Sequence, residues 1–152
     1  MAEGFKLSFS VEWEKQASRI LNWMVSKLKD MSPIFKEVSE TLDEWVKKNF
    51  SSEGKEFEVT WDPLSPNTIR QKAKLWYWSK QILERTGALR NAFHAKYGKD
   101  FAEVYNDSPY FAYHQSNQAR KIIPRRIMFK LTNQYISTIV KIFQKYLTFT
   151  DR

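Results

Sequence analysis

The sequence contains no cysteine, and its 152 residues include only two histidines, four glycines and five prolines. Without cysteine the chain can form no disulfide, no thiolate nucleophile and no cysteine-ligated zinc site. The glycines, at positions 4, 54, 87 and 98, make neither the GxGxxG nor the GxxxxGK pattern of a phosphate-binding loop. The sequence therefore gives no support to a nucleotide-driven motor.

The titratable residues show no catalytic or metal-ligating arrangement. His94 and His114 have no metal-ligand spacing with each other or with a carboxylate. Asp62, Glu84 and Asp107 are too scattered in the sequence to suggest a carboxylate pair. His114 follows a run of aromatic residues, and we interpret it as an aromatic-cluster histidine with one hydrogen bond rather than as a general base. We expect no catalytic residue, no metal and no cofactor.

Long apolar runs are also missing. No stretch approaches the ~20 apolar residues needed to span a membrane, and the first ten residues alternate polar and apolar types, unlike a signal peptide. We expect a soluble protein without membrane contact. At 42% hydrophobic and 16% aromatic residues, the chain has enough apolar surface for one compact domain.

Charge is unevenly distributed along the chain, whose net charge is +8. Residues 1–60 hold 9 Lys/Arg against 11 Asp/Glu, and residues 61–152 hold 16 against 6. Such asymmetry indicates a surface for nucleic acid, a surface for an acidic protein partner, or simply a solvated basic face.

Two amphipathic helices are predicted at the start of the chain. Apolar residues recur every three or four positions within residues 10–30, with Ser10 as the cap, and again within residues 32–50, where Ser32 and Pro33 signal a helix start. The joint between them is short. The helices therefore form either an antiparallel pair or two arms of one bent element.

The rest of the chain predicts short strands and helices. An alternation of apolar and polar residues indicates a short strand over 57–61, and residues 92–105 resemble a hairpin that turns at 98–100. Residues 75–78 either continue the preceding helix or break from it, and Thr86-Gly87 opens a helical turn or a strand. Helices are predicted over 66–74, 110–115 and 136–147. The fold class is α+β, with amphipathic helices packed on a small antiparallel sheet in a single domain; residues 1–30 form a helical extension to a domain of residues 31–152.

Two clusters are candidates for binding. The densest basic cluster follows residue 119 and consists of Arg120, Lys121, Arg125 and Arg126. The densest aromatic cluster contains Trp76 and Trp78. Together they are typical of single-stranded nucleic-acid binding by charge and stacking, although the tryptophans equally suit a core or a subunit interface. We predict that both Arg125 and Arg126 face solvent or a partner's carboxylates, because two adjacent guanidinium groups are costly to bury.

Four segments, in order, resemble the phage virion-morphogenesis family. Residues 61–72 contain the sequence WDPLSPNT, and residues 82–90 contain ILERTGALR. Residues 108–115 read SPYFAYHQ, and residues 123–131 read IPRRIMFKL, with Ile127 where the family pattern has a second proline. Residues 31–50 are similar to the opening helix of the family, so the resemblance covers residues 31–147.

The resemblance implies a non-enzymatic structural protein that acts in tail completion or head–tail joining of a tailed bacteriophage. Its partners would be other neck or tail proteins and further copies of itself in an oligomeric ring, for which a hexamer is one size. It would be located in the host cytoplasm during assembly and then in the neck or tail of the virion. The alternative is a basic protein that contacts packaged DNA, and a nuclease or cell-wall hydrolase is the weakest hypothesis.

Overall fold

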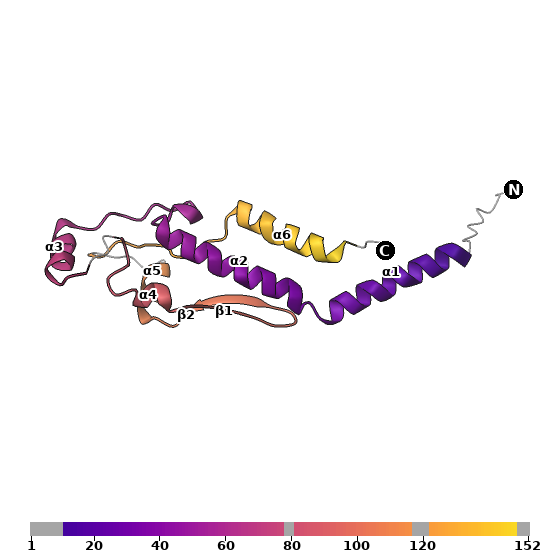
Figure 1. Ribbon diagram of the computed structural model, residues 1–152. Helices are drawn as coiled ribbons and strands as arrows, with labels where there is room; N and C mark the ends of the chain where they lie inside the picture. Colours follow the sequence, from indigo (N-terminus) through magenta and orange to yellow (C-terminus); the bar gives the residue numbers. More distant parts are fainter. Residues whose placement is uncertain (1–10, 78–80, 117–121, 149–152) are drawn as a thin grey trace.

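The computed structural model describes residues 11–77, 81–116 and 122–148. It shows an elongated molecule in which helices flank a two-stranded sheet, which confirms the α+β class (Figure 1). Along the chain the elements are α1 Val11–Lys29, α2 Ser32–Ser51, the 3₁₀ helix η1 Lys55–Phe57, α3 Pro66–Lys74, α4 Ala88–Asn91, β1 Phe93–Tyr97, β2 Ala102–Asn106, α5 Pro109–Gln115 and α6 Asn133–Leu147.

Helix α2 is the axis of the packed body. It lies between the hairpin and α6 (Figure 1), and its helical period places apolar side chains on both of these sides. The residues that it buries in the core are Ile34, Val38, Leu42, Trp45, Val46 and Phe50. The hairpin and α6 therefore both pack on α2. The predicted helix over 32–50 is confirmed.

The predicted hairpin is confirmed. β1 and β2 are antiparallel, with Phe93 opposite Asn106 and Tyr97 opposite Ala102, and the chain turns over residues 98–101. On the side that faces α2, the Phe93 ring makes edge-to-face contacts with Phe50 at 5.8 Å and with Phe111 at 5.5 Å between centroids. These contacts fix the sheet to α2 and α5.

Helix α6 packs along the other side of α2 in the opposite direction. Tyr135, near its start, stacks on Trp45 near the end of α2 with centroids 3.9 Å apart. Near its end, Lys145 forms an ion pair of 3.0 Å with Glu37, close to the start of α2. Thr132 caps the helix by accepting a hydrogen bond from the Tyr135 amide. The predicted last helix is therefore present and begins at Asn133.

The predicted strand over 57–61 is wrong. After α2 the chain turns sharply through Gly54, whose φ is +95°, and residues 55–57 form η1. A Cβ at Gly54 would lie 2.1 Å from the Val59 carbonyl oxygen, so only glycine fits this turn. Phe57 and Trp61 are both buried, as their alternation indicated, but on a loop that folds back over the end of α2. Periodic burial alone did not specify extended backbone.

The side chain of Asn49 joins three segments at this end of the body. It is fully buried in α2, and its amide nitrogen donates to the Met128 carbonyl at 3.1 Å. Its carbonyl oxygen accepts from the Phe57 amide at 3.4 Å. The amide thereby satisfies one buried backbone group in η1 and one in the segment before α6.

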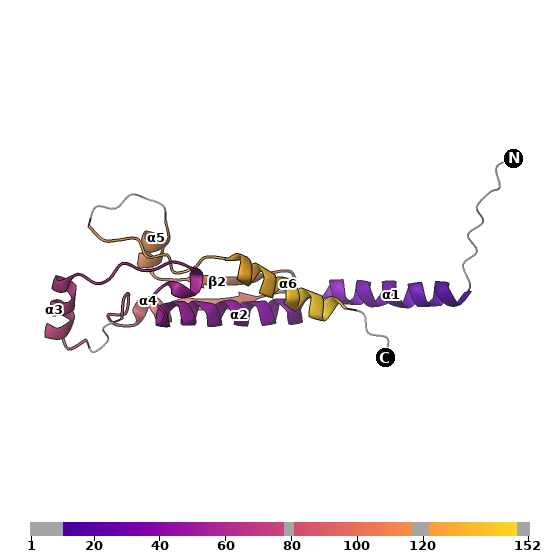
Figure 2. The same ribbon diagram turned by 90° about the horizontal axis from the view of Figure 1, so that it is seen from above.

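The joint between α1 and α2 makes them two arms of one bent element, one of the two predicted arrangements. Asp30 accepts a hydrogen bond from the Ser32 amide at 2.9 Å, and Met31, not Ser32, is the cap residue of α2. Pro33 then occupies the first turn. Helix α1 therefore extends from the N-terminal end of α2, away from both the hairpin and α6 (Figures 1 and 2).

The short helices begin where serine–proline pairs predicted them. Ser65 accepts from the Thr68 amide at 3.2 Å at the start of α3, and Ser108 accepts from the Tyr110 amide at 3.3 Å at the start of α5. α3 ends at Lys74, and Trp76 adopts a left-handed conformation with φ of +57°, so the chain breaks from the helix there.

The role of Asn49 can be tested by Asn49→Ala. We expect the free energy of unfolding to fall by about 3 kcal/mol, because two buried backbone groups lose their partner. Urea denaturation would measure the change, with Asn67→Ala on the exposed surface of α3 as a control within about 0.5 kcal/mol of wild type. Equal stability of the two variants would contradict the assigned role.

Tyr135 predicts a loss of stability at alkaline pH. Burial raises the pKa of its hydroxyl above the ordinary value, and the hydrogen bond to Glu56 adds to the effect. Because the unfolded tyrosine ionises near pH ~10 and the folded one at higher pH, its contribution is complete below pH ~10 and is lost as the pH rises further. Urea denaturation between pH 8 and 11 should therefore show a steeper loss of stability for wild type than for Tyr135→Phe; parallel curves would refute this assignment.

Candidate interaction surfaces

Segments that carry the family-like motifs meet in the folded chain. The Trp61 indole donates to the Ile127 carbonyl at 2.8 Å. The Arg126 guanidinium donates to the Asp62 carbonyl at 2.9 and 3.2 Å and to the Pro63 carbonyl at 3.5 Å. The first and fourth motifs are therefore bonded to each other across more than sixty residues of sequence.

The third motif contributes Gln115 to the same assembly. Its amide nitrogen donates to the Phe129 carbonyl at 2.6 Å, and its oxygen accepts from the Met128 and Phe129 amides at 3.1 and 3.3 Å. The neighbouring His114 is buried, with its ring edge-to-face with Tyr113 at 5.4 Å. His114 thus lies in the predicted aromatic setting, and these motif residues hold loop segments in place.

The prediction that both arginines after Pro124 face outward is wrong for Arg126. Only 6% of Arg126 is exposed, and its charge is placed against backbone carbonyls instead of a partner's carboxylates. Burial lowers the pKa of this guanidinium, partly offset by the nearby Asp62 carboxylate, and an arginine remains protonated even so. Arg125 is exposed as predicted and donates to the Gln115 carbonyl at 2.9 Å.

Of the other predicted interaction residues, Arg120, Lys121 and Trp78 lie outside the described residues. Trp76 is 76% exposed. With Arg126 engaged in the fold, the predicted basic cluster loses one of its four members as a surface for phosphate. DNA binding stays a prediction, and the burial of Arg126 weakens the case that the basic cluster made for it.

Helix α3 lies at the end of the molecule opposite α1 (Figure 1), and exposed apolar side chains lie on it and directly after it. We call this surface the α3 tip; it consists of Ile69, Leu75 and Trp76. Lys72 fastens the tip to the following loop, because its buried ammonium donates to the Gln81 and Glu84 carbonyls at 2.8 and 2.7 Å. Burial lowers the pKa of Lys72. Lys72 lies in the predicted helix over 66–74, and no local pattern in the sequence indicated that it would be buried.

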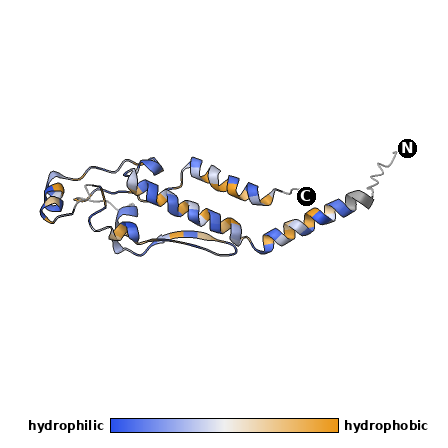
Figure 3. Cartoon of the chain, viewed as in Figure 1, coloured by the Kyte–Doolittle hydropathy of each residue, from blue (hydrophilic) through white to orange (hydrophobic). Residues whose placement is uncertain are grey.

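Helix α1 presents a second apolar surface, which we call the arm stripe. Its members are Leu21, Met24, Val25 and Leu28, which are 44–61% exposed. Their spacing is that of a helix that packs on a core, yet α1 projects away from the body (Figures 1 and 3). The predicted amphipathic helix is present, but its apolar side is not buried within the described part of the chain.

Helix α6 carries a third apolar surface on its outer side, which we call the α6 face. It consists of exposed Ile136, Val140 and Leu147 with partly buried Ile139 and Phe143. A shallow groove of about 430 Å³ lies along the last three turns, lined by Val140, Phe143 and Leu147 among others. Hydrophobic residues recur along both α1 and α6 (Figure 3).

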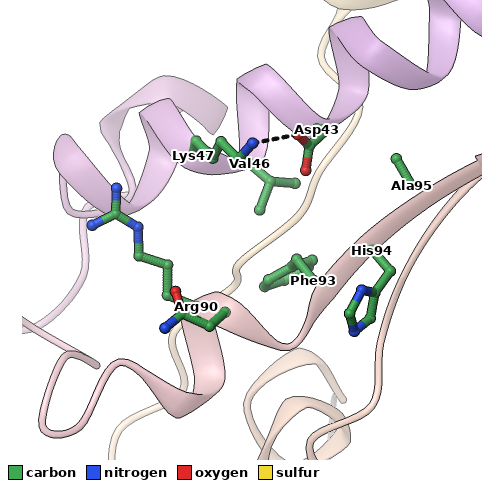
Figure 4. Close-up of a pocket in the computed structure, with 8 residues that line it drawn as sticks. Asp43, Val46, Lys47, Arg90, Phe93, His94 and Ala95 are labelled. Carbon is green, nitrogen blue, oxygen red and sulfur yellow. Dashed lines mark hydrogen bonds and ion pairs between the residues drawn. The ribbon is translucent and has the colours of Figure 1, made fainter.

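A polar pocket of about 580 Å³ lies between α2 and the start of β1 (Figure 4). Its polar side chains have partners: Lys47 pairs with Asp43 at 2.6 Å, Arg90 pairs with Glu84 at 2.6 Å, and the His94 imidazole lies 3.1 Å from the Asp107 carboxylate. The side chains of Lys47, Arg90 and His94 do not converge on one point in the pocket (Figure 4). This pocket was not predicted from the sequence, and the arrangement fits a polar surface between α2 and the hairpin.

The described residues bring no three His, Asp or Glu side chains together in a way that could hold a metal ion. None of the helices in this part of the chain combines the length and apolar character needed to cross a membrane.

Comparison with known proteins gives one family. A model described as the phage virion morphogenesis family matches residues 12–148. The match includes nearly all of α1, which the motif resemblance left outside its range of 31–147. No curated protein and no solved structure matched the chain.

The corrected role of Arg126 can be tested by comparing Arg126→Ala with Arg125→Ala. We expect the former to lower the free energy of unfolding by about 2 kcal/mol, because hydrogen bonds from a charged donor are lost. Arg125→Ala is the matched control and should stay within about 1 kcal/mol of wild type. Thermal or urea unfolding would measure both, and an Arg126→Ala protein as stable as the control would show that the buried guanidinium does not stabilise the fold.

Proposed function

Because the chain belongs to the phage virion morphogenesis family and so acts in assembly of a bacteriophage virion, we propose that it is a structural protein of tail completion or head–tail joining. It works by binding other virion proteins and further copies of itself, not by catalysis. It is present in the host cytoplasm during assembly and afterwards in the neck or tail.

The observation that carries this proposal is the placement of the exposed apolar surfaces. The arm stripe and the α3 tip lie at opposite ends of an elongated molecule, and the α6 face lies along its side (Figure 1). Clustered apolar side chains on a surface are typical of protein interfaces, and the large ring of Trp76 is of the type enriched among residues that dominate binding. A protein with such surfaces at both ends is suited to join neighbours.

The assembly that we propose is a ring. Phage necks and tails have rotational symmetry, and a contact between two different surfaces of identical subunits closes into a ring when the rotation allows it. The end-to-side placement of the apolar surfaces favours such a contact over a symmetric dimer. A hexamer is one size consistent with this symmetry.

The proposal is tested by interrupting the gene in the phage or prophage that encodes it. We expect lysates to contain heads and tails that electron microscopy finds unjoined, or tails that lack their end structure, and no infectious particles. Plasmid-borne wild-type protein should restore joined particles. Normal infectious particles without the protein would refute the proposed function.

The tip residue Trp76 provides a sharper version of this test. We expect Trp76→Ala to fold as wild type, because the side chain is exposed, but to restore at most a small fraction of the infectious particles. Exposed Tyr110→Ala, on α5, is the matched control and should complement as wild type. Full complementation by Trp76→Ala would show that the α3 tip contacts no virion partner.

A further inference from the structure

The arm stripe and the α6 face are two apolar helical surfaces of one chain that do not meet each other. We propose that the arm stripe of one copy packs, antiparallel, on the α6 face of a second copy. This inference rests on the proposed self-assembly and names the surfaces that would form it. The partner that covers the α6 face is a second copy of this chain. The evidence is the direction, charge and length of α1 and α6.

The arm stripe is built as one side of a helix–helix contact. Its four residues fall on one side of α1 by helical period, while Lys15 and Arg19 fall on the opposite side. Lys27 and Lys29, in the last turn, flank the stripe on either side. Packing on the stripe therefore buries apolar side chains and leaves these cations at its edges.

The α6 face, like the stripe, is a line of apolar side chains along one side of a helix. Its exposed residues follow one line along the helix and are 37–47% exposed: Ile136, Val140 and Leu147. The shallow groove along the last turns of α6 lies beside this line. α1 has 19 residues and α6 has 15. At ~1.5 Å per residue these helices are roughly 28 and 22 Å long. The stripe itself occupies residues 21–28, so it covers part of the face formed by residues 136–147, and the rest of α1 extends along α6.

The direction of α6 decides between two ways of covering it. Since α6 runs opposite to α2, its C-terminal end lies beside the start of α2, where Lys145 pairs with Glu37. An arm that folded back from the joint at Met31 onto its own α6 would have to run parallel to α6. The arm in the structure instead continues from α2 away from its own body, and can lie antiparallel only on another copy (Figures 1 and 2).

Charge favours the antiparallel arrangement. Folding back on the same chain would bring Lys27 and Lys29 next to Lys141 and Lys145, because all four lie towards the C-terminal ends of their helices. Antiparallel packing brings the arm lysines to the start of α6 instead. There Tyr135 donates a hydrogen bond to Glu56, and Glu58 is close enough to act on the pKa of Tyr135. The arm lysines then lie away from Lys141 and Lys145, so antiparallel packing avoids the contact between like charges.

The contact is heterologous, because an arm meets a side and not another arm. An open chain of copies therefore keeps one free arm at one end and one free α6 face at the other until the last subunit joins the first, which is the geometry that closes rings. The family match from residue 12 to residue 148 includes both helices.

Disulfide trapping tests the inference directly, because the full chain has no cysteine of its own. Leu28→Cys and Ile136→Cys are made in separate full-length proteins with tags of different size, mixed, and oxidised mildly. We expect a cross-linked species of mixed mass, since antiparallel packing places the end of α1 at the start of α6. The double variant Leu28→Cys with Leu147→Cys reports the alternative, and an intramolecular disulfide in its monomer would overturn the inference in favour of a folded-back arm.

Charge substitutions in the same surfaces provide an independent measurement. We expect Leu28→Glu and Val140→Glu each to shift the protein to monomer in sedimentation velocity at concentrations where wild type is oligomeric, with circular dichroism melting unchanged. Arg19→Glu, on the opposite side of α1, is the matched control and should remain oligomeric. Wild type that is monomeric at high concentration, or Leu28→Glu and Val140→Glu variants that still assemble, would overturn the inference.

The outcomes separate this inference from the proposed function. If the interrupted gene leaves heads and tails unjoined but the mixed disulfide does not form, the assembly role stands and the α1–α6 contact is wrong. If the disulfide forms and virions assemble normally without the protein, the contact exists and the proposed role in joining is wrong.

Discussion

The buried amide of Asn49 is the interaction on which the rest of the body depends. The 3₁₀ helix η1 and the segment before α6 cross the end of α2, and each has a buried backbone group there. A single side chain satisfies both, as donor to Met128 and acceptor from Phe57. Unpaired buried backbone groups are costly, so the paths of η1 and of the segment before α6 are fixed relative to α2 by this residue.

The same solution recurs through the body. Gln115, Trp61 and Arg126 each use a side chain to bond a backbone carbonyl or amide far away in the sequence. These side-chain hydrogen bonds hold the segment before α6 in place. In a larger sheet, hydrogen bonds between backbone groups of neighbouring strands would do so. The family-like motifs are accordingly fold elements, and Arg126 is one of them. The surfaces that the body does not bury, namely the arm stripe, the α6 face and the α3 tip, are the ones that we propose for self-association and partner binding.

Local patterns predicted the elements whose formation depends on neighbouring residues. The cap bond of Ser65, the hairpin turn at 98–100 and the apolar period of α6 are all short-range properties, and each was confirmed. The prediction of a strand over 57–61 was wrong because the alternation of apolar and polar residues indicates which side chains are buried. It does not specify the backbone conformation. Trp76 was identified as an interaction candidate from composition, but its placement at the α3 tip required the fold.

The sequence by itself determined helices α1, α2, α3, α5 and α6, the hairpin and the α+β class, since these follow from spacing, capping and turn chemistry between near neighbours. The four motifs indicated the family. The 3₁₀ helix η1 was not predicted, and the segment that forms α4 was left open between a helical turn and a strand. Only the tertiary structure decided that Arg126 is buried and Arg125 exposed, because carbonyls from residues 62 and 63 happen to converge on one guanidinium. It also decided the direction of α1. The same amphipathic sequence fits a packed pair or a projecting arm, and the structure has the arm, with Asp30 bonded to the Ser32 amide at the joint and Pro33 in the first turn of α2.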